Sequence, residues 1–180
     1  MENVQSKLVL VAGLPGCGKT TFSAALADEI GALHLNSDKV RIEIGKTGRY
    51  DEATKASVYE ELLHRMEAGL SAGKMVIVDA TFYKKELWLP FSQIAKKLKA
   101  PVYWIEIKAG EDVIRARIGQ KRSFSEANFE VYLKIKVEAE PLEMERLVLW
   151  SDRLTLEEMT REAKTYLGAG EAPTEDGRTR

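Results

Sequence analysis

The sequence predicts an α/β fold, a three-layer sandwich in which helices cover a parallel β-sheet. Short apolar runs alternate along the chain with longer amphipathic segments, which is typical of strands that alternate with helices. A glycine-rich segment, Gly13 to Thr20, follows the first apolar run. The chain has 180 residues, 44% hydrophobic and 31% charged, which is enough for one domain with a buried core.

Five strands are predicted from the apolar runs. The runs Met75 to Val78 and Val102 to Ile107 are rich in β-branched and aromatic residues, as expected of strands in a sheet. The predicted strands lie at about residues 7–12, 32–36, 74–79, 101–107 and 146–150.

Helices are predicted for the amphipathic segments at about residues 18–30, 52–72, 84–99, 111–120, 125–138 and 155–167. Thr155 followed by Glu158 predicts a capping box at the start of the last helix. Residues 168–180 contain almost no apolar side chain, so we expect a disordered tail after a single domain at 1–167.

The segment Gly13 to Thr20 matches the pattern G-x-x-x-x-G-K-[ST] between a predicted strand and a predicted helix. In a P-loop of this kind, backbone N–H groups and the lysine hold the phosphates of ATP or GTP, and the final hydroxyl binds Mg²⁺. Lys19 would therefore reach the β- and γ-phosphates, and Thr20 would bind the metal. The predicted nucleotide-binding residues are Gly13, Gly16, Cys17, Gly18, Lys19, Thr20 and Thr21.

Cys17 is the single cysteine, which excludes an intramolecular disulfide framework and favours a reducing, cytoplasmic location. A helix N-terminus would lower the pKa of its thiol, so that oxidation could block nucleotide binding. The alternative is that Cys17 is simply a small residue tolerated in the loop.

Asp38 and Arg41 follow the second predicted strand and share one face if a helix begins there. Asp38 could accept a proton from an attacking hydroxyl, and Arg41 could pair with phosphate. The alternative is that Ser37 or Asp38 caps the helix and that Arg41 is a solvated partner.

Asp79 stands at the end of the third predicted strand, where P-loop enzymes keep an acid that holds Mg²⁺. Two alternatives remain open: an ordinary turn residue, or a residue that lines the acceptor site together with Thr81.

A basic segment follows the fourth predicted strand and contains Arg115, Arg117, Lys121 and Arg122. A mobile basic segment that closes over ATP would stabilise the transferring phosphoryl group and exclude water, so a lid is predicted at about 110–124. The alternative is a solvated helix face.

The net charge of −1 provides no overall basic field, so no stable nucleic-acid complex is expected. No segment has the length of a membrane span, and the N-terminus lacks the layout of a signal peptide. His34 and His64 match no metal or triad pattern and receive no predicted role. Oligomeric state is not indicated.

Taken together, GLPGCGKT, NSDKVR, VIVDATF and RARIGQKR followed by SFSEANFEVY resemble the AAA_33 group of small P-loop kinases, which includes polynucleotide 5′-hydroxyl kinases and zeta-toxin-like kinases. The resemblance implies a sheet of order 2-3-1-4-5 and places a general base on Asp38 and a phosphate ligand on Arg41. It places lid arginines on Arg117 and on one of Lys121 and Arg122.

The expected function is an ATP- and Mg²⁺-dependent kinase whose acceptor is a hydroxyl of a small molecule or of a nucleic-acid 5′ end. Its catalytic residues would be Lys19, Asp38, Arg41, Arg117 and Arg122, with Thr20 and Asp79 at the metal. One alternative is an ATP-binding switch or accessory ATPase without an acceptor. Another is an RNA or DNA end-processing partner that acts mainly by binding.

Overall fold

The computed structural model describes residues 6–119 and 129–168 and has a five-stranded parallel sheet at its centre. Its strand order is β2-β3-β1-β4-β5, so both the predicted α/β class and the predicted order are confirmed. Each strand begins and ends within about two residues of its predicted bounds. The strands are β1 (Leu8–Ala12), β2 (Leu33–Asn36), β3 (Val76–Asp79), β4 (Val102–Lys108) and β5 (Leu147–Trp150).

The central strands are covered on both faces, which explains their uninterrupted apolar sequences. Every residue of β1 and of β3 is buried. In the register, Leu10 of β1 lies between Val78 of β3 and Trp104 of β4. Leu8 and Leu10 pack into the core on one face, and Val9 and Val11 into the core on the other, because side chains alternate along a strand.

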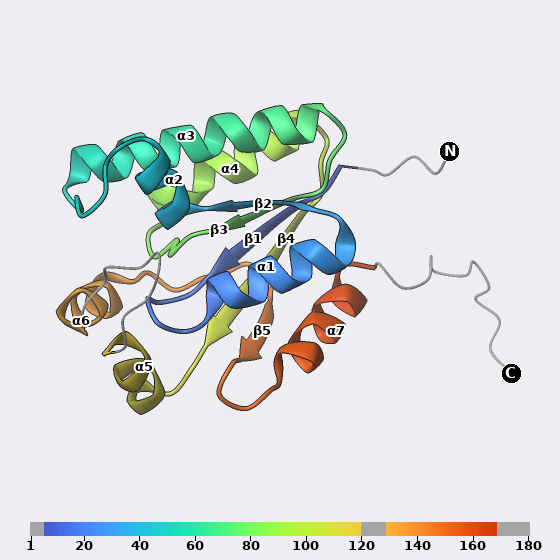
Figure 1. The fold of residues 1–180 in the computed structure, drawn as a ribbon. Coiled ribbons are helices and arrows are strands. Elements are labelled where there is room, and N and C mark those ends of the chain that lie inside the picture. Colours follow the sequence, from blue (N-terminus) through green and yellow to red (C-terminus); the bar gives the residue numbers. More distant parts are fainter. Residues whose placement is uncertain (1–5, 120–128, 169–180) are drawn as a thin grey trace, which may run out of the picture.

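Helices form a layer on each face of the sheet (Figure 1). One layer consists of α2, α3 and α4, and the other consists of α1 and α7. Helices α5 and α6 lie at the end of the sheet toward which the strands point. The helices are α1 (Lys19–Ile30), α2 (Ser37–Glu43), α3 (Glu52–Ser71), α4 (Lys85–Lys97), α5 (Glu111–Ile118), α6 (Phe129–Glu138) and α7 (Leu156–Tyr166).

The capping box predicted for the last helix is present. The Thr155 hydroxyl accepts a hydrogen bond from the Glu158 N–H at 3.2 Å, and the Glu158 carboxylate accepts one from the Thr155 N–H at 2.7 Å. Helix α2 occupies the segment where a helix was required for Asp38 and Arg41 to share a face. The predictions for 125–128 and for the tail from 169 onward lie outside the described residues.

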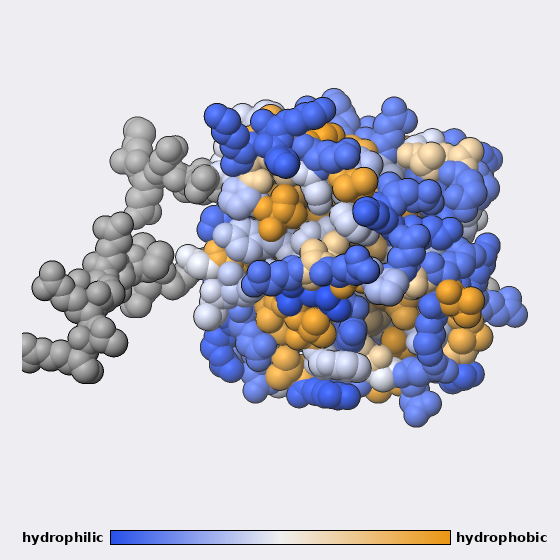
Figure 2. All heavy atoms as spheres, turned by 180° about the vertical axis from the view of Figure 1, so that it is seen from behind, coloured by the Kyte–Doolittle hydropathy of each residue, from blue (hydrophilic) through white to orange (hydrophobic). Residues whose placement is uncertain are grey.

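The surface opposite the view of Figure 1 is largely hydrophilic, with hydrophobic side chains in small, separated groups (Figure 2). Among the described helices, none combines the length and the apolar character that crossing a membrane requires.

Candidate active site

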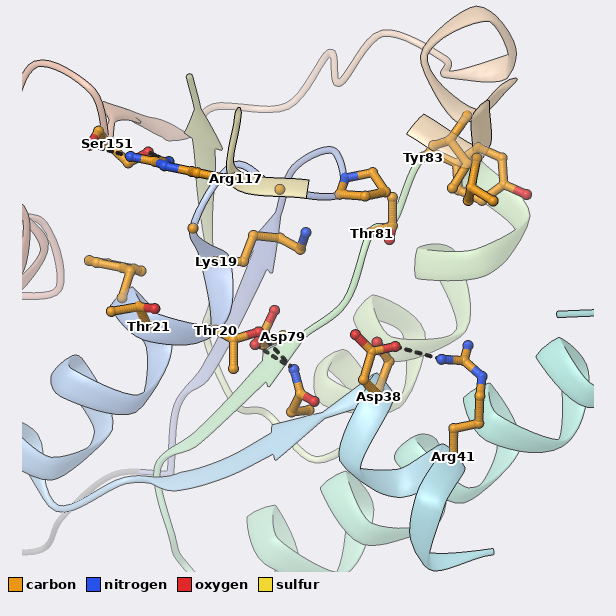
Figure 3. A pocket seen from close by; sticks show the side chains of 18 of the residues that line it. Lys19, Thr20, Thr21, Asp38, Arg41, Asp79, Thr81, Tyr83, Arg117 and Ser151 are labelled. Carbon is orange, nitrogen blue, oxygen red and sulfur yellow. Dashed lines mark hydrogen bonds and ion pairs between the residues drawn. The ribbon is translucent and has the colours of Figure 1, made fainter. Parts of the chain in front are cut away.

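A cavity of about 750 Å³ lies beyond the carboxyl ends of the strands, where ligands bind in open α/β sheets (Figure 3). Its walls come from segments that are far apart in the sequence: the loop before α1, the start of α2 and of α3, the end of β3, one face of α6 and the β5–α7 connection. Among the predicted site residues, those that line it are Gly16, Gly18, Lys19, Thr20, Thr21, Asp38, Arg41, Asp79 and Arg117.

The glycines of the predicted P-loop hold backbone conformations that other residues avoid. Gly13 has φ of +151°, and a Cβ placed there would lie 2.4 Å from the carbonyl oxygen of Ile107. Gly18, the residue before α1, is left-handed with φ of +98°. Lys19 begins α1, and its Nζ donates to the Leu14 carbonyl at 3.2 Å, so that the side chain folds back over the loop. The loop therefore has the shape that a phosphate cradle requires.

Thr20, Asn36 and Asp79 form a hydrogen-bonded group beneath this loop (Figure 3). Nδ2 of Asn36 donates to Asp79 Oδ2 at 2.7 Å and to Thr20 Oγ1 at 3.1 Å. The second oxygen of Asp79, Oδ1, is buried and has no partner within the described residues. A buried carboxylate oxygen without a donor fits a water of a hydrated Mg²⁺ ion, because hard cations keep several waters.

Asn36 is a site residue that the sequence analysis missed. It is 4% exposed, and its Oδ1 accepts from the Lys39 N–H at 2.9 Å, which caps α2. One side chain thus joins the P-loop helix, β3 and the helix that carries Asp38. A signal was present in the sequence: an amide, which both donates and accepts, ends the predicted second strand two residues before Asp38.

His34 was also assigned no role, yet its Nε2 lies 3.4 Å from Asp79 Oδ2. His34 and Asn36 are two residues apart on β2, so their side chains leave the same face of the sheet. Alternation along the strand could have indicated that both approach the same neighbour.

Asp38 lies in the first turn of α2, and its Oδ1 is 2.5 Å from Nη1 of Arg41. The helix is capped by Asn36, so the alternative in which Ser37 or Asp38 is the cap is wrong. Burial raises the pKa of Asp38 above its ordinary value of 3.8, although the charges of Arg41 and Lys19 oppose the rise. A carboxylate that is more basic than usual suits proton abstraction.

Arg41 is largely buried and is only partly used by this ion pair. Its Nε has no partner within the described part of the chain. Its guanidinium lies 4.6 Å from the centre of the Tyr50 ring, which fixes its plane. Arg41 therefore lines the cavity with a guanidinium whose buried Nε has no acceptor among the described residues.

The connection after β3 contributes Thr81 and Tyr83 to the cavity wall. Phe82 between them has φ of +49°, an uncommon value for a residue with a side chain. Phe82 is 1% exposed, and its ring makes edge contacts with Tyr59, Phe91 and Trp104. Packing of this ring maintains the unusual backbone and leaves the flanking residues at the cavity.

Arg117 on α5 is anchored beside the P-loop. Its Nη1 donates to Ser151 Oγ at 2.8 Å and to the Cys17 carbonyl at 3.4 Å, and its Nη2 donates to the Ser151 carbonyl at 3.2 Å. Arg115 points elsewhere, with its guanidinium 3.9 Å from the centre of the Phe129 ring. The second lid cation was predicted at Lys121 or Arg122, and both residues lie outside the described part of the chain.

The expectation of an acidic thiol at Cys17 is wrong. The side chain is 1% exposed, and burial raises its pKa, which outweighs the lowering by the Lys19 charge and backbone N–H. A Cβ on Gly13 would lie 2.7 Å from Cys17 Sγ, so the space beside this side chain is narrow. Cys17 is accordingly a small residue packed under the loop.

Comparison with known families and proteins gives the following relationships. The model of the AAA_33 family, described as an AAA domain, matches residues 8–142. The uncharacterized protein Rv2004c of Mycobacterium tuberculosis is 26% identical over 130 residues. That match covers 66% of this chain but 26% of the relative, so the chain spans about a quarter of the relative's length.

Solved structures of other proteins share the fold, among them the following two. The APS kinase CysC of Mycobacterium tuberculosis, in complex with AMPPNP and APS, superposes with a TM-score of 0.71 at 16% identity and covers 91% of this chain and 98% of its own. Kti12 of Chaetomium thermophilum, in complex with ADP-AlF3, has a TM-score of 0.68 at 22% identity and covers 92% and 99%. Both of these neighbours were captured with a bound nucleotide.

Proposed function

Because the chain belongs to the AAA_33 family of AAA domains, we propose that it is a kinase that transfers the γ-phosphate of ATP to a hydroxyl group. Support comes from the placement of a basic carboxylate in the same cavity as the phosphate-binding loop. A protein that only binds or hydrolyses nucleotide needs no such group aimed at an acceptor.

The proposed chemistry assigns one task to each part of the cavity. The N–H groups of the loop and the ammonium of Lys19 bind the phosphates. Thr20 and Asp79 would hold Mg²⁺, which would neutralise phosphate charge when it is bound. Asp38 takes the proton of the acceptor hydroxyl as that oxygen bonds to the γ-phosphorus. The bond to the β-phosphate oxygen breaks, and ADP leaves with its electron pair.

Arg41 has two functions in this proposal. Its Nη1 holds the Asp38 carboxylate in place. Its guanidinium, which lines the same cavity, would stabilise the charge that develops on the transferring group. Arg117, held against the Cys17 carbonyl and Ser151, positions α5 at the nucleotide end of the cavity rather than at Asp38.

The test is transfer of labelled γ-phosphate from ATP with Mg²⁺ to a panel of hydroxyl compounds and 5′-hydroxyl oligonucleotides, by the wild type and by Asp38→Ala. Transfer that the variant loses, with ATP affinity unchanged, would support the proposal. If ATP is bound or hydrolysed and Asp38→Ala behaves like the wild type, the ATP-binding switch would be the better description.

A further inference from the structure

The acceptor half of the cavity lies between α2, the first turns of α3, the connection after β3 and α6. Its charged groups are largely neutralised by one another. Arg41 pairs with Asp38 at 2.5 Å, Lys55 with Glu52 at 2.9 Å, and Lys84 beside it with Glu138 at 3.3 Å. A site for a polyanion would instead keep cations without carboxylate partners.

Lys55 and Glu52 present a donor and an acceptor side by side. Lys55 Nζ bonds to Glu52 Oε1 at 2.9 Å and to the Tyr83 hydroxyl at 2.7 Å, which uses two of its three hydrogens. The hydrogen bond from Lys55 lowers the pKa of Glu52, so that this carboxylate stays ionised and accepting. Two adjacent hydroxyls on one molecule match this arrangement, because one can donate to Glu52 while the other accepts from Lys55.

Helix α6 closes this half of the cavity. Four of its residues, at helical spacing, line the cavity: Val131, Lys134, Ile135 and Glu138. Its C-terminal end is fixed to the connection after β3, where Glu140 N–H donates to the Tyr83 carbonyl at 2.8 Å and Lys85 N–H to the Glu140 carboxylate at 2.6 Å.

Size also limits the acceptor. One drug-sized ligand fills a pocket of about 300–1,000 Å³, and the cavity of about 750 Å³ is shared with the nucleotide. Glu52 and Glu138 both line the cavity, so a polynucleotide seated there would bring its phosphodiesters near two carboxylates. Lys134 adds one positive charge on this wall, which suits at most a single anionic group and not a run of phosphodiesters.

We propose that the phosphoryl acceptor is a compact polyol with neighbouring hydroxyls, held by Lys55, Glu52 and Tyr83, and not a polynucleotide 5′ end. This inference rests on the kinase function proposed above. Lys55, Glu52 and Tyr83 bind hydroxyls that do not react, while the reacting hydroxyl faces Asp38, which takes its proton as the γ-phosphate is transferred.

The experiment measures transfer of labelled phosphate to pentoses, hexoses, cyclitols and nucleosides in one arm and to 5′-hydroxyl RNA and DNA oligonucleotides in the other. Lys55→Met and Glu52→Gln test the recognition pair. Glu60→Gln is the matched control, because Glu60 is an exposed acid on the same helix that does not line the cavity. KM is measured for the acceptor and for ATP.

We expect a polyol to be the better acceptor. Loss of a hydrogen bond from a charged group predicts a rise of about tenfold or more in the acceptor KM for Lys55→Met. Glu52→Gln should produce a smaller rise, because the Glu52 side chain is 86% exposed and its interactions are weakened by solvent. The KM for ATP should be unchanged in both recognition variants. In the Glu60→Gln control, the KM values for ATP and for the acceptor should both be unchanged. Removing one neighbouring hydroxyl from the preferred acceptor should have a similar effect in the wild type.

Three results would overturn the inference. Higher kcat/KM for oligonucleotides than for every polyol would overturn it and leave the kinase proposal intact. Equal rises in the KM for ATP and for the acceptor in Lys55→Met would show that the pair does not recognise the acceptor. Absence of ATP binding by calorimetry would remove the kinase proposal itself.

Discussion

Removal of the Asn36 side chain should weaken both the fold and the proposed magnesium site, because one amide serves both. In Asn36→Ala, α2 loses its N-cap, which typically costs about 1 kcal/mol. The buried Asp79 carboxylate loses its 2.7 Å donor, at a typical cost of about 1–3 kcal/mol. His34 at 3.4 Å is too distant to replace that bond well. The expected total is about 2–4 kcal/mol of unfolding free energy.

Asn36→Ser separates the two contributions. Serine caps helices about as well as asparagine, but it has no amide to reach Asp79 and Thr20. This variant should therefore lose only the second contribution, about 1–3 kcal/mol. Urea denaturation at one pH measures all three proteins.

The Mg²⁺ requirement should change equally in the two variants, whereas their free energies of unfolding should differ. Both variants free Thr20 Oγ1 and Asp79 Oδ2 from their shared donor. We expect both to need about 10–100-fold more Mg²⁺ for half-maximal activity, as is common when an outer ligand partner is removed. Wild-type stability in Asn36→Ala, or an unchanged Mg²⁺ requirement in both variants, would refute the reasoning.

Further predictions concern the base, the loop and α5. In kcat/KM profiles, activity should fall as pH falls through the Asp38 pKa, which lies above 3.8 because burial disfavours the ionised form. This acid limb should be absent in Asp38→Asn, whose activity should be about 10²–10⁴-fold lower; an identical limb in the variant would assign it to another group. Gly13→Ala should cost more than about 3 kcal/mol in urea denaturation, because it combines an unfavourable φ with a 2.4 Å contact. Gly31→Ala, with φ of +65° and open space, should cost only about 1–2 kcal/mol; equal costs would contradict the steric explanation. Arg117→Met should raise the KM for ATP about tenfold or more in steady-state assays, because the hydrogen bonds from its charged guanidinium that hold α5 beside the P-loop are lost. Arg115→Met serves as its control.

The parts of the fold that could be predicted are those that residues close together in the sequence determine. The central strands are buried on both faces, so their apolar runs have no polar interruption. Gly13, Gly16 and Gly18 occupy positive φ angles, which fix glycine at those spacings. The capping box of α7 lies within one turn. Each of these features can be recognised without knowing what packs against it.

The features that were missed or mistaken depend on contacts between distant segments. Asn36 matters because β2 lies beside β3 and places its amide against Asp79. Cys17 has a raised pKa because the core covers it, although its position at a helix start predicts the opposite. In both cases, burial set by the tertiary structure outweighs the local signal.

The basicity of Asp38 depends on its burial in the fold as well as on its position in the sequence. Its place after a strand made it a candidate base, but position alone leaves its basicity undetermined. A fully paired, exposed aspartate beside Arg41 and Lys19 would have a lowered pKa and would be a poor base. Here burial is the largest influence and raises the pKa despite both cations. The packing that buries Asp38 therefore also makes it basic, and this property follows from the tertiary structure and not from its position after a strand.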